Sequence, residues 1–464
     1  MLGGAGFAVV LTAGLATVSL PQAAAVESCR GRPATHVGRT GHELTGTAGS
    51  DVMVSNGAFQ VTAGDGDDIV CVTGDFGSPE VYAGTGEDAV VVELVDYADT
   101  YTSLGPGDDT FVGGDGPDVV GAVVRAFVDE GGDDTIRTRG GDDVVAVGTR
   151  RAGPAVTADV DLGAGNDLLR VDQSGALATS SLRGGGGQDV LSAWVGPETT
   201  QAAIDLPARR ATADGRVVAS GWEGFEAFVS TQANRGAGGT ERGARLVVVG
   251  TAGDDVVRSD SAVRTTGDLR GGDDVISVVG ETDLDLGPGD DWARVEQVGT
   301  GAGRIDGGTG RDRIGASAPY ARPWLDLGRR TLTRVGRPAP AVAVVGFEDG
   351  DVYSSAGRLT GDGLENVLRA QCGRIDGGGG DDVLTQRRFV ATTSTDPFAA
   401  LTTVPDTGRS TCAAFRADGG PGDDRLGGSD GNDVLLGGPG RDRANGYAGR
   451  DRCEAEVRRG CEPR

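Results

Sequence analysis

Apolar residues along the chain fall in short runs that alternate with polar or small residues, and glycine-rich acidic segments separate one run from the next. The run at 89–95, Ala-Val-Val-Val-Glu-Leu-Val, is typical of them. Runs of four to eight residues bounded by Gly and Asp predict short β-strands joined by tight turns. The 3.6-residue periodicity of an amphipathic helix is hard to find beyond the N-terminus, so the pattern predicts an all-β chain.

One pattern recurs in the turns: Gly, any residue, Asp, any residue, then an apolar residue. Such self-similarity is typical of a stacked structure in which each repeat buries its apolar face against its neighbours. The apolar residue is expected to point into a core, and the Gly and Asp residues to form the turn. The Asp positions of the pattern are Asp51, Asp68, Asp88, Asp109, Asp118, Asp134, Asp143, Asp167, Asp189, Asp255, Asp274, Asp291, Asp312, Asp382, Asp424, Asp433, Asp442 and Asp451.

The spacing of the pattern is most regular near the C-terminus. Four nonapeptides follow one another directly over 419–454. Two nonapeptides would form one coil, so Asp424 is expected to stack near Asp442, and Asp433 near Asp451.

Upstream, one copy per coil is expected. From Asp51 to Asp109 the successive spacings are 17, 20 and 21 residues, and from Asp255 to Asp312 they are 19, 17 and 21, each close to one coil. These Asp residues are therefore predicted to stack along one edge of a solenoid, the opposite turn having lost its acidic residue. Asp118 and Asp143 each follow another copy by nine residues and should mark coils with an acidic turn at both edges. Glu43 lies near the Asp slot of a decayed first copy.

Two long intervals, 189–255 and 312–382, lack the pattern and are each close to three coils in length. The first contains Gly-Trp-Glu-Gly-Phe-Glu at 221–226, and the second contains Val-Gly-Phe-Glu at 345–348. The similar motifs favour degenerate coils of the same structure, with small inserted loops as the alternative. The prediction is a parallel β-roll or β-solenoid of about twenty coils.

The tandem copies resemble the haemolysin-type, or RTX, calcium-binding repeat GGxGxDxUx. Residues 437–445, for example, read GGPGRDRAN. The resemblance implies a β-roll that binds multiple Ca²⁺ ions between the turns of neighbouring coils, with the sixth-position Asp as side-chain ligand. Calcium takes six to eight oxygen ligands, and Gly turns can add carbonyl oxygens to the carboxylates. The implied metal ligands are Asp68, Asp88, Asp109, Asp118, Asp134, Asp143, Asp167, Asp189, Asp255, Asp274, Asp291, Asp312, Asp382, Asp424, Asp433, Asp442 and Asp451.

Where two Asp residues adjoin, the alignment with the tail selects the second as the ligand. In the pairs 142–143 and 273–274 the first Asp is therefore expected to face solvent.

The formal net charge of −26 changes the picture of the metal-free chain. Stacked carboxylates repel one another without counterions, and glycine-rich chains lose much entropy on folding. Both effects predict an expanded chain that becomes ordered as calcium binds. An acidic chain also argues against a nucleic-acid partner, because such proteins carry clustered basic charge.

The N-terminus and the cysteines both indicate export. Residues 2–20 are apolar and Ala-Ala-Ala at 23–25 offers a cleavage site, so 1–25 is predicted to be a signal peptide, with a retained membrane anchor as the alternative. The six cysteines suggest disulfides, and fifteen connectivities are open. Pairing with the nearest cysteine gives Cys29–Cys71, Cys372–Cys412 and Cys453–Cys461. The predicted units are 1–25, a solenoid over 26–418, the tandem repeats over 419–454 and a disulfide-stapled cap over 455–464.

The sequence does not indicate an enzyme. The chain has no lysine, so a P-loop and Schiff-base chemistry are excluded, and His36 and His42 form no HExxH motif. The GxSxG match at 427–431 lies inside the repeats and is a coincidence of composition. One alternative is a calcium-dependent β-helix polysaccharide lyase or epimerase, which would use acidic residues near Arg such as Glu223, Glu226 and Asp312. A second is a cell-surface adhesin. The expected protein is a secreted or cell-surface monomer, with calcium and a surface or extracellular-matrix partner.

Overall fold

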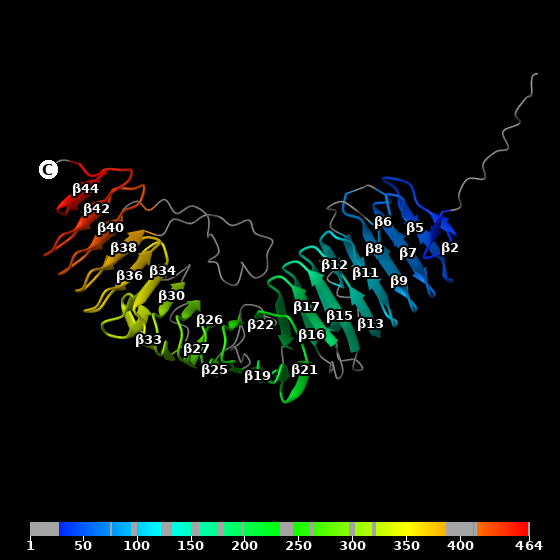
Figure 1. Cartoon of the computed structure of the whole chain (residues 1–464), viewed down its shortest axis with the longest axis horizontal. Helices are drawn as coiled ribbons and strands as arrows, with labels where there is room; N and C mark the ends of the chain where they lie inside the picture. Colours follow the sequence, from blue (N-terminus) through cyan, green and yellow to red (C-terminus); the bar gives the residue numbers. More distant parts are fainter. Residues whose placement is uncertain are drawn as a thin grey trace, which may run out of the picture.

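The computed structural model describes residues 27–74, 77–93, 100–121, 132–149, 157–173, 181–195, 199–232, 245–259, 264–296, 302–317, 322–386, 412 and 415–462. All of the secondary-structure elements in these segments are β-strands, and Figure 1 shows them stacked coil upon coil in a curved rod. Among the described residues, no helix has the length and apolarity needed to cross a bilayer. The predicted signal peptide, 1–25, lies outside the described residues.

Each coil adds one parallel strand to a long sheet that follows the whole rod. Figure 1 places its two ends at opposite ends of the molecule. Among the described residues this sheet has nineteen strands, which agrees with the predicted number of about twenty coils. In order they are β4 (Glu43–Thr45), β6 (Gln60–Asp65), β8 (Glu80–Thr85), β10 (Thr100–Ser103), β12 (Asp118–Val120), β14 (Val144–Thr149), β16 (Leu168–Gln173), β18 (Val190–Val195), β22 (Ala227–Gln232), β24 (Val256–Ser259), β26 (Val275–Val279), β28 (Trp292–Glu296), β30 (Arg313–Ser317), β34 (Asp349–Tyr353), β36 (Val367–Ala370), β38 (Val383–Gln386), β40 (Arg425–Gly427), β42 (Arg443–Asn445) and β44 (Val457–Arg459).

The second wall of the solenoid consists of two sheets in succession. The N-terminal one contains β3 (His36–Val37), β5 (Val52–Val54), β7 (Ile69–Val72), β9 (Ala89–Val92), β11 (Thr110–Val112), β13 (Asp133–Arg137), β15 (Thr157–Ala164) and β17 (Ser181–Gly186). The C-terminal one contains β19 (Gln201–Asp205), β20 (Arg210–Ala213), β21 (Arg216–Ser220), β23 (Arg245–Val249), β25 (Arg264–Asp268), β27 (Glu281–Asp285), β29 (Gly303–Asp306), β31 (Pro323–Asp326), β32 (Thr331–Arg334), β33 (Arg337–Val345), β35 (Gly357–Thr360), β37 (Gly373–Asp376), β39 (Phe415–Asp418), β41 (Val434–Leu436) and β43 (Arg452–Glu454). A short hairpin of β1 (Ser28–Cys29) and β2 (Arg32–Pro33) precedes them.

The core lies between the two walls and is continuous along the rod. Equivalent residues of successive coils stack, as Val70 does on Val90 and Val90 on Phe111. All three are completely buried, as predicted for the apolar residue that follows each turn Asp by two positions. Because successive strands pair residue for residue in this register, the turn Asp residues of successive coils also lie above one another.

The two long intervals belong to the same solenoid, and each carries inserted antiparallel strands. In the first, the long sheet advances from β18 through β22 to β24, while β20 and β21 pair antiparallel beside β19. In the second it advances through β34 and β36 to β38, and β32 lies antiparallel between β31 and β33. The prediction of three coils is thus confirmed for the second interval. For the first interval it is wrong: the long sheet advances by two strands, and the hairpin of β20 and β21 takes up the residues of the third coil.

The three predicted disulfides are all present: Cys29–Cys71, Cys372–Cys412 and Cys453–Cys461. The first ties the N-terminal hairpin to β7, and the last closes the chain around the final strand, β44. Both ends of the rod are therefore covalently fastened, which a stacked fold needs because its terminal coils have a neighbour on one side alone.

Candidate metal centre

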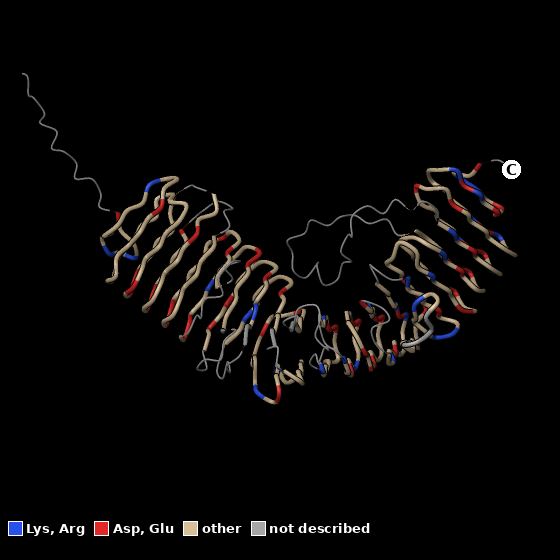
Figure 2. The backbone as a smooth tube through the Cα atoms, turned by 180° about the vertical axis from the view of Figure 1, so that it is seen from behind, with Lys and Arg blue, Asp and Glu red and all other residues tan. Residues whose placement is uncertain are grey.

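The turn residues form five rows in which a backbone N–H of one coil donates to the side chain of the next. Asp68 N, for example, lies 2.8 Å from Asp88 Oδ1, and Asp382 N lies 2.9 Å from Asp424 Oδ1. Figure 2 shows acidic residues recurring at successive turns along the rod. Row 1 is Asp51, Asp68, Asp88, Asp109 and Asp134; row 2 is Asp118, Asp143, Asp167 and Asp189; row 3 is Asp255, Asp274, Asp291 and Asp312; row 4 is Asn366, Asp382, Asp424 and Asp442; row 5 is Asp433 and Asp451.

The rows occupy both edges of the solenoid, so the prediction of a single edge is wrong. Asp68 follows a strand of the long sheet, whereas Asp143 precedes one. Rows 1 and 5 lie at the first edge, and rows 2, 3 and 4 lie at the second. The change of edge falls at the coils of Asp118 and Asp143, which carry acidic turns at both edges as predicted. The predicted stacking in the tail is also confirmed, because Asp442 accepts from Asp424 N and Asp451 from Asp433 N.

Glu43 does not join these rows. It lies on β4 with its side chain exposed, and row 1 begins at Asp51. The decayed copy therefore supplies a strand but no turn carboxylate.

Most of the predicted ligands bury one carboxylate oxygen without any hydrogen-bond partner. The Oδ1 atom accepts the N–H of the preceding coil, and the Oδ2 atom is left over. A buried unpaired oxygen costs about 1–3 kcal/mol, and more when it is charged. Among the described residues the unpaired Oδ2 atoms at the turns belong to Asp68, Asp88, Asp109, Asp143, Asp167, Asp189, Asp274, Asp291, Asp312, Asp382, Asp424, Asp442 and Asp451.

In six of these turns the first residue is glycine, and the unpaired oxygen faces a hollow that this glycine keeps open; they are the turns of Asp189, Asp312, Asp382, Asp424, Asp442 and Asp451. In the other seven turns the first residue is Ala, Leu or Thr. A Cβ atom on Gly419 would lie 2.2 Å from Asp424 Oδ2 and 2.6 Å from the carbonyl oxygen of Gly437 in the next coil. A Cβ on Gly446 would lie 2.3 Å from both Asp451 Oδ2 and the Gly460 carbonyl oxygen. A carboxylate and a carbonyl oxygen thus converge on one point, and this is the mixture of donors that calcium prefers.

These residues fit calcium bound by carbonyls as well as carboxylates. In the part of the chain that the structure describes, no group of three or more His, Cys, Asp or Glu side chains could hold a metal by itself. Backbone oxygens would therefore have to complete the coordination at each turn.

Filling one hollow tests this arrangement. The variant Gly419→Ala should lose about 1–3 kcal/mol of calcium-bound stability, because its methyl group would occupy the space between two oxygens. Gly253→Ala is the matched control: it also lies in a turn, neither glycine has a left-handed φ, and the nearest atom to its Cβ is 4.0 Å away. Thermal unfolding in excess calcium measures both. Equal melting temperatures for the two variants would contradict the importance of the hollow.

Many carboxyl groups of the rows have raised pKa values. Burial, reinforced by the charges of Asp255 and Asp291 in the adjoining coils, raises the pKa of Asp274 to about 8. The same causes, with Asp167 and Asp118 as neighbours, raise the pKa of Asp143 to about 8. The preceding residues, Asp142 and Asp273, are exposed as predicted. In the absence of a cation the inner carboxylates therefore resist ionisation near neutral pH.

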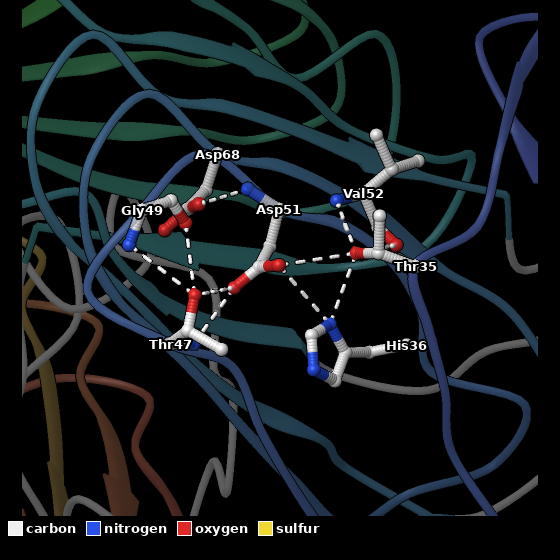
Figure 3. Close-up of polar contacts among 7 residues, drawn as sticks. All are labelled: Thr35, His36, Thr47, Gly49, Asp51, Val52 and Asp68. Carbon is white, nitrogen blue, oxygen red and sulfur yellow. Dashed lines mark hydrogen bonds and ion pairs between the residues drawn. The ribbon is translucent and has the colours of Figure 1, made fainter.

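The first turns of rows 1, 3 and 5 differ, because Thr or Ser replaces the second glycine. Figure 3 shows Asp51 receiving hydrogen bonds from Thr47 N at 2.7 Å, Thr47 Oγ1 at 2.8 Å and Thr35 Oγ1 at 3.1 Å, with His36 Nδ1 3.2 Å away. Although burial raises the pKa of Asp51, the hydrogen bonds from Thr47 and Thr35 outweigh it and lower that pKa overall. Both oxygens of this carboxylate are satisfied by the protein.

Four predicted ligands lack a buried unpaired oxygen. Asp255 accepts from Thr251 N at 2.7 Å, and Asp433 accepts from Ser429 N at 2.5 Å. Asp118 accepts from Gly114 N at 3.1 Å, and Asp134, at the end of row 1, is half-buried. The sequence contained the signal for two of these in GTAGDD at 250–255 and GSDGND at 428–433, where the second position is not glycine.

Sequence reasoning missed four glutamates that stand at the ends of rows 2 to 5. Glu226 Oε2 lies 2.7 Å from Asp189 N, Glu348 Oε2 lies 2.8 Å from Asp312 N, and Glu456 Oε2 lies 2.7 Å from Asp442 N. Glu462 accepts from Asp451 N in the same way. The shared Gly-Phe-Glu at 224–226 and 346–348 was the available signal for the first two.

Comparison with known proteins gives one family match. The model of the RTX calcium-binding nonapeptide repeat matches four copies, over residues 104–120, 127–149 and 418–453. These are the segments in which two acidic turns lie nine residues apart. A search of curated protein sequences finds no match to the chain. The rows extend the geometry of the matched turns to coils that keep a single acidic turn.

Proposed function

Because this chain carries RTX calcium-binding nonapeptide repeats, we propose that it is a secreted β-roll protein whose folding is driven by the calcium ions that its stacked turns bind. The observation that carries the proposal is the unpaired Oδ2 atom, buried at the same place in coil after coil. We assign the thirteen Asp residues with this oxygen as the side-chain ligands. Carbonyl oxygens such as that of Gly437 lie beside them as further donors.

Coupling to folding is supported by the electrostatics of the rows. Bound calcium supplies positive charge between stacked carboxylates, in a chain whose formal net charge is −26. Since the turns are assembled from residues of neighbouring coils, the sites do not exist in the unfolded chain, and the binding energy becomes folding energy.

Secretion is supported by the disulfides and by the calcium requirement together. Disulfides persist in oxidising compartments, where extracellular modules bind calcium at about 10⁻⁴–10⁻³ M. In the calcium-poor cytosol the chain would remain unfolded, and it would fold after export.

The residues that motivate the polysaccharide lyase alternative make contacts between coils. Glu226 accepts the N–H of Asp189, Arg311 forms an ion pair with Asp349 at 3.0 Å, and Arg313 pairs with the buried Asp351. These side chains therefore form contacts that join neighbouring coils. An adhesive role at the cell surface is compatible with the calcium-dependent rod.

Two adjacent carboxylates give the sharpest test of the ligand assignment. Asp424 is buried in row 4, whereas its neighbour Asp423 is exposed. The variant Asp424→Asn keeps an oxygen to accept from Asp382 N but loses the charged donor, so calcium should bind its turn about tenfold or more weakly. Asp423→Asn removes the same charge and should leave binding unchanged.

The measurement is the number and affinity of bound calcium ions, from equilibrium dialysis of the full chain. Equal losses in the two variants would show that overall charge governs binding. No loss in either would remove Asp424 from the set of ligands.

A further inference from the structure

We propose that Glu226, Glu348, Glu456 and Glu462 are calcium ligands that complete the last site of rows 2, 3, 4 and 5. This inference rests on the proposed function, and it adds a residue type that the repeat pattern does not contain. Each of these four rows ends at a coil that has no GGxGxD turn at that edge, yet this coil still supplies oxygens to the turn before it.

Strand register places these glutamates where the next Asp of the row would stand. Val190 pairs with Ala227, so Glu226 lies opposite Asp189. Arg313 pairs with Asp349 in the same way, so Glu348 lies opposite Asp312. The N–H of the last Asp, which would otherwise donate to an Asp Oδ1 atom, donates to the glutamate Oε2 atom at 2.7 and 2.8 Å.

The backbone of the closing coils supplies the second donor. Inside a row, the Gly437 carbonyl of the next coil lies 2.6 Å from the Cβ position of Gly419. At the ends of rows the carbonyls of Gly224 and Gly346 lie 1.9 and 2.4 Å from the Cβ positions of Gly184 and Gly307, the first glycines of the last turns. The closing coil therefore repeats the internal arrangement of donors without a GGxGxD turn.

An independent observation shows that the last turns still lack a partner. The Oδ2 atoms of Asp189, Asp312, Asp442 and Asp451 are buried and unpaired, although no Asp follows them in their rows. These side chains are at most 2% exposed. Without a cation at this point, the row would end on an unsatisfied carboxylate.

Row 1 provides an internal contrast. It ends at Asp134, and the residue paired with Asp134 in the next coil is Ala158. Asp134 is half-buried, and its carboxylate is not among the buried unpaired ones. The row that lacks a closing glutamate is thus the row whose last carboxylate reaches solvent.

The test is to replace single glutamates and count the calcium ions bound to the full chain by native mass spectrometry and equilibrium dialysis. Glu226→Gln and Glu456→Gln should each weaken one calcium site about tenfold or more and leave the others unchanged. Their matched controls, Glu223→Gln and Glu454→Gln, remove the same charge from the same closing coils. Glu223 and Glu454 pair instead with Arg209 and Arg452, and both controls should bind as the wild type does.

Each outcome tests either the proposed function or the role of the glutamates. Failure of the wild-type chain to bind calcium would overturn the proposed function itself. Normal binding by the wild type together with unchanged binding by Glu226→Gln and Glu456→Gln, or equal losses in the controls, would overturn the inference alone. If Glu226→Gln does not fold, Glu462→Gln makes the same test at the end of row 5. Glu462→Asp, which keeps the charge but is shorter, should also lose the site.

Discussion

Removal of calcium should convert the rod into an expanded chain with little β-structure. Thirteen buried unpaired oxygens at about 1–3 kcal/mol each amount to roughly 13–39 kcal/mol, which is as large as or larger than the usual stability of a domain, about 5–15 kcal/mol. Repulsion between carboxylates of adjoining coils adds to this cost. The metal-free rod should therefore not persist at neutral pH.

Far-UV circular dichroism after EDTA treatment, followed by titration with calcium, measures this change. The β-signal should be lost with EDTA and return with calcium. Magnesium is the control, because it demands octahedral geometry and gives up its water reluctantly. A spectrum indifferent to EDTA would mean that the rows hold together without metal, and recovery with magnesium alone would mean simple charge screening.

The metal-free chain should regain β-structure as the pH falls from about 8 to about 5. In the folded rows the pKa of Asp143 and Asp274 is about 8, and that of Asp109 and Asp382 about 7, against an ordinary value of 3.8 in the unfolded chain. The cause in each case is burial first, then neighbouring carboxylates. Between the folded and unfolded pKa values the folded state binds more protons than the unfolded state. The free energy of unfolding therefore increases as the pH falls, and this gain is fully present below about pH 4.

With calcium present the effect of pH on folding reverses. Protons and calcium compete for the same carboxylates, so the calcium concentration at half-folding should increase as the pH falls through 8 to 6. A titration of ellipticity at fixed pH values gives both curves. Salt at about 0.5 M provides the control, since it screens exposed charges but affects buried ones much less. If salt at neutral pH restored the fold as acid does, the raised pKa values of the inner carboxyls would not be the cause.

The sequence allowed the coil, the core and the ligand type to be predicted, because each depends on residues close together in the chain. The alternation of apolar residues specifies a strand and its buried face, as at Val70 and Val90. The spacing of two nonapeptides specifies a coil, and glycine at the first position specifies a turn with room for an ion. These features were sufficient to foresee the stacking of Asp424 on Asp442.

The edge of the solenoid and the row ends could not be predicted in this way. A coil has two turns, and the edge that a given Asp occupies depends on the lengths of both connections. The change of edge between Asp109 and Asp143 is therefore invisible in the pattern. Glu226 and Glu456 were missed for a related reason: they occupy the Asp register without the Gly turn, and their role depends on the coil before them in space. Thr251 and Ser429 visibly replace glycine at the second position of their turns, but the hydrogen bonds that satisfy the carboxylate depend on the folded turn.

The spacing of row 4 has a consequence for how such a chain can acquire new parts. Asp382 and Asp424 are 42 residues apart in sequence, yet their bond of 2.9 Å matches those of neighbours 17 to 21 residues apart, such as Asp274 and Asp291 at 2.8 Å. The position of one turn on the next therefore does not depend on the length of chain that connects the two walls. A foreign sequence placed between β38 and β39 would enlarge a connection without shifting any carboxylate. The rows of carboxylates would therefore keep their geometry while the connection between the walls changes in length.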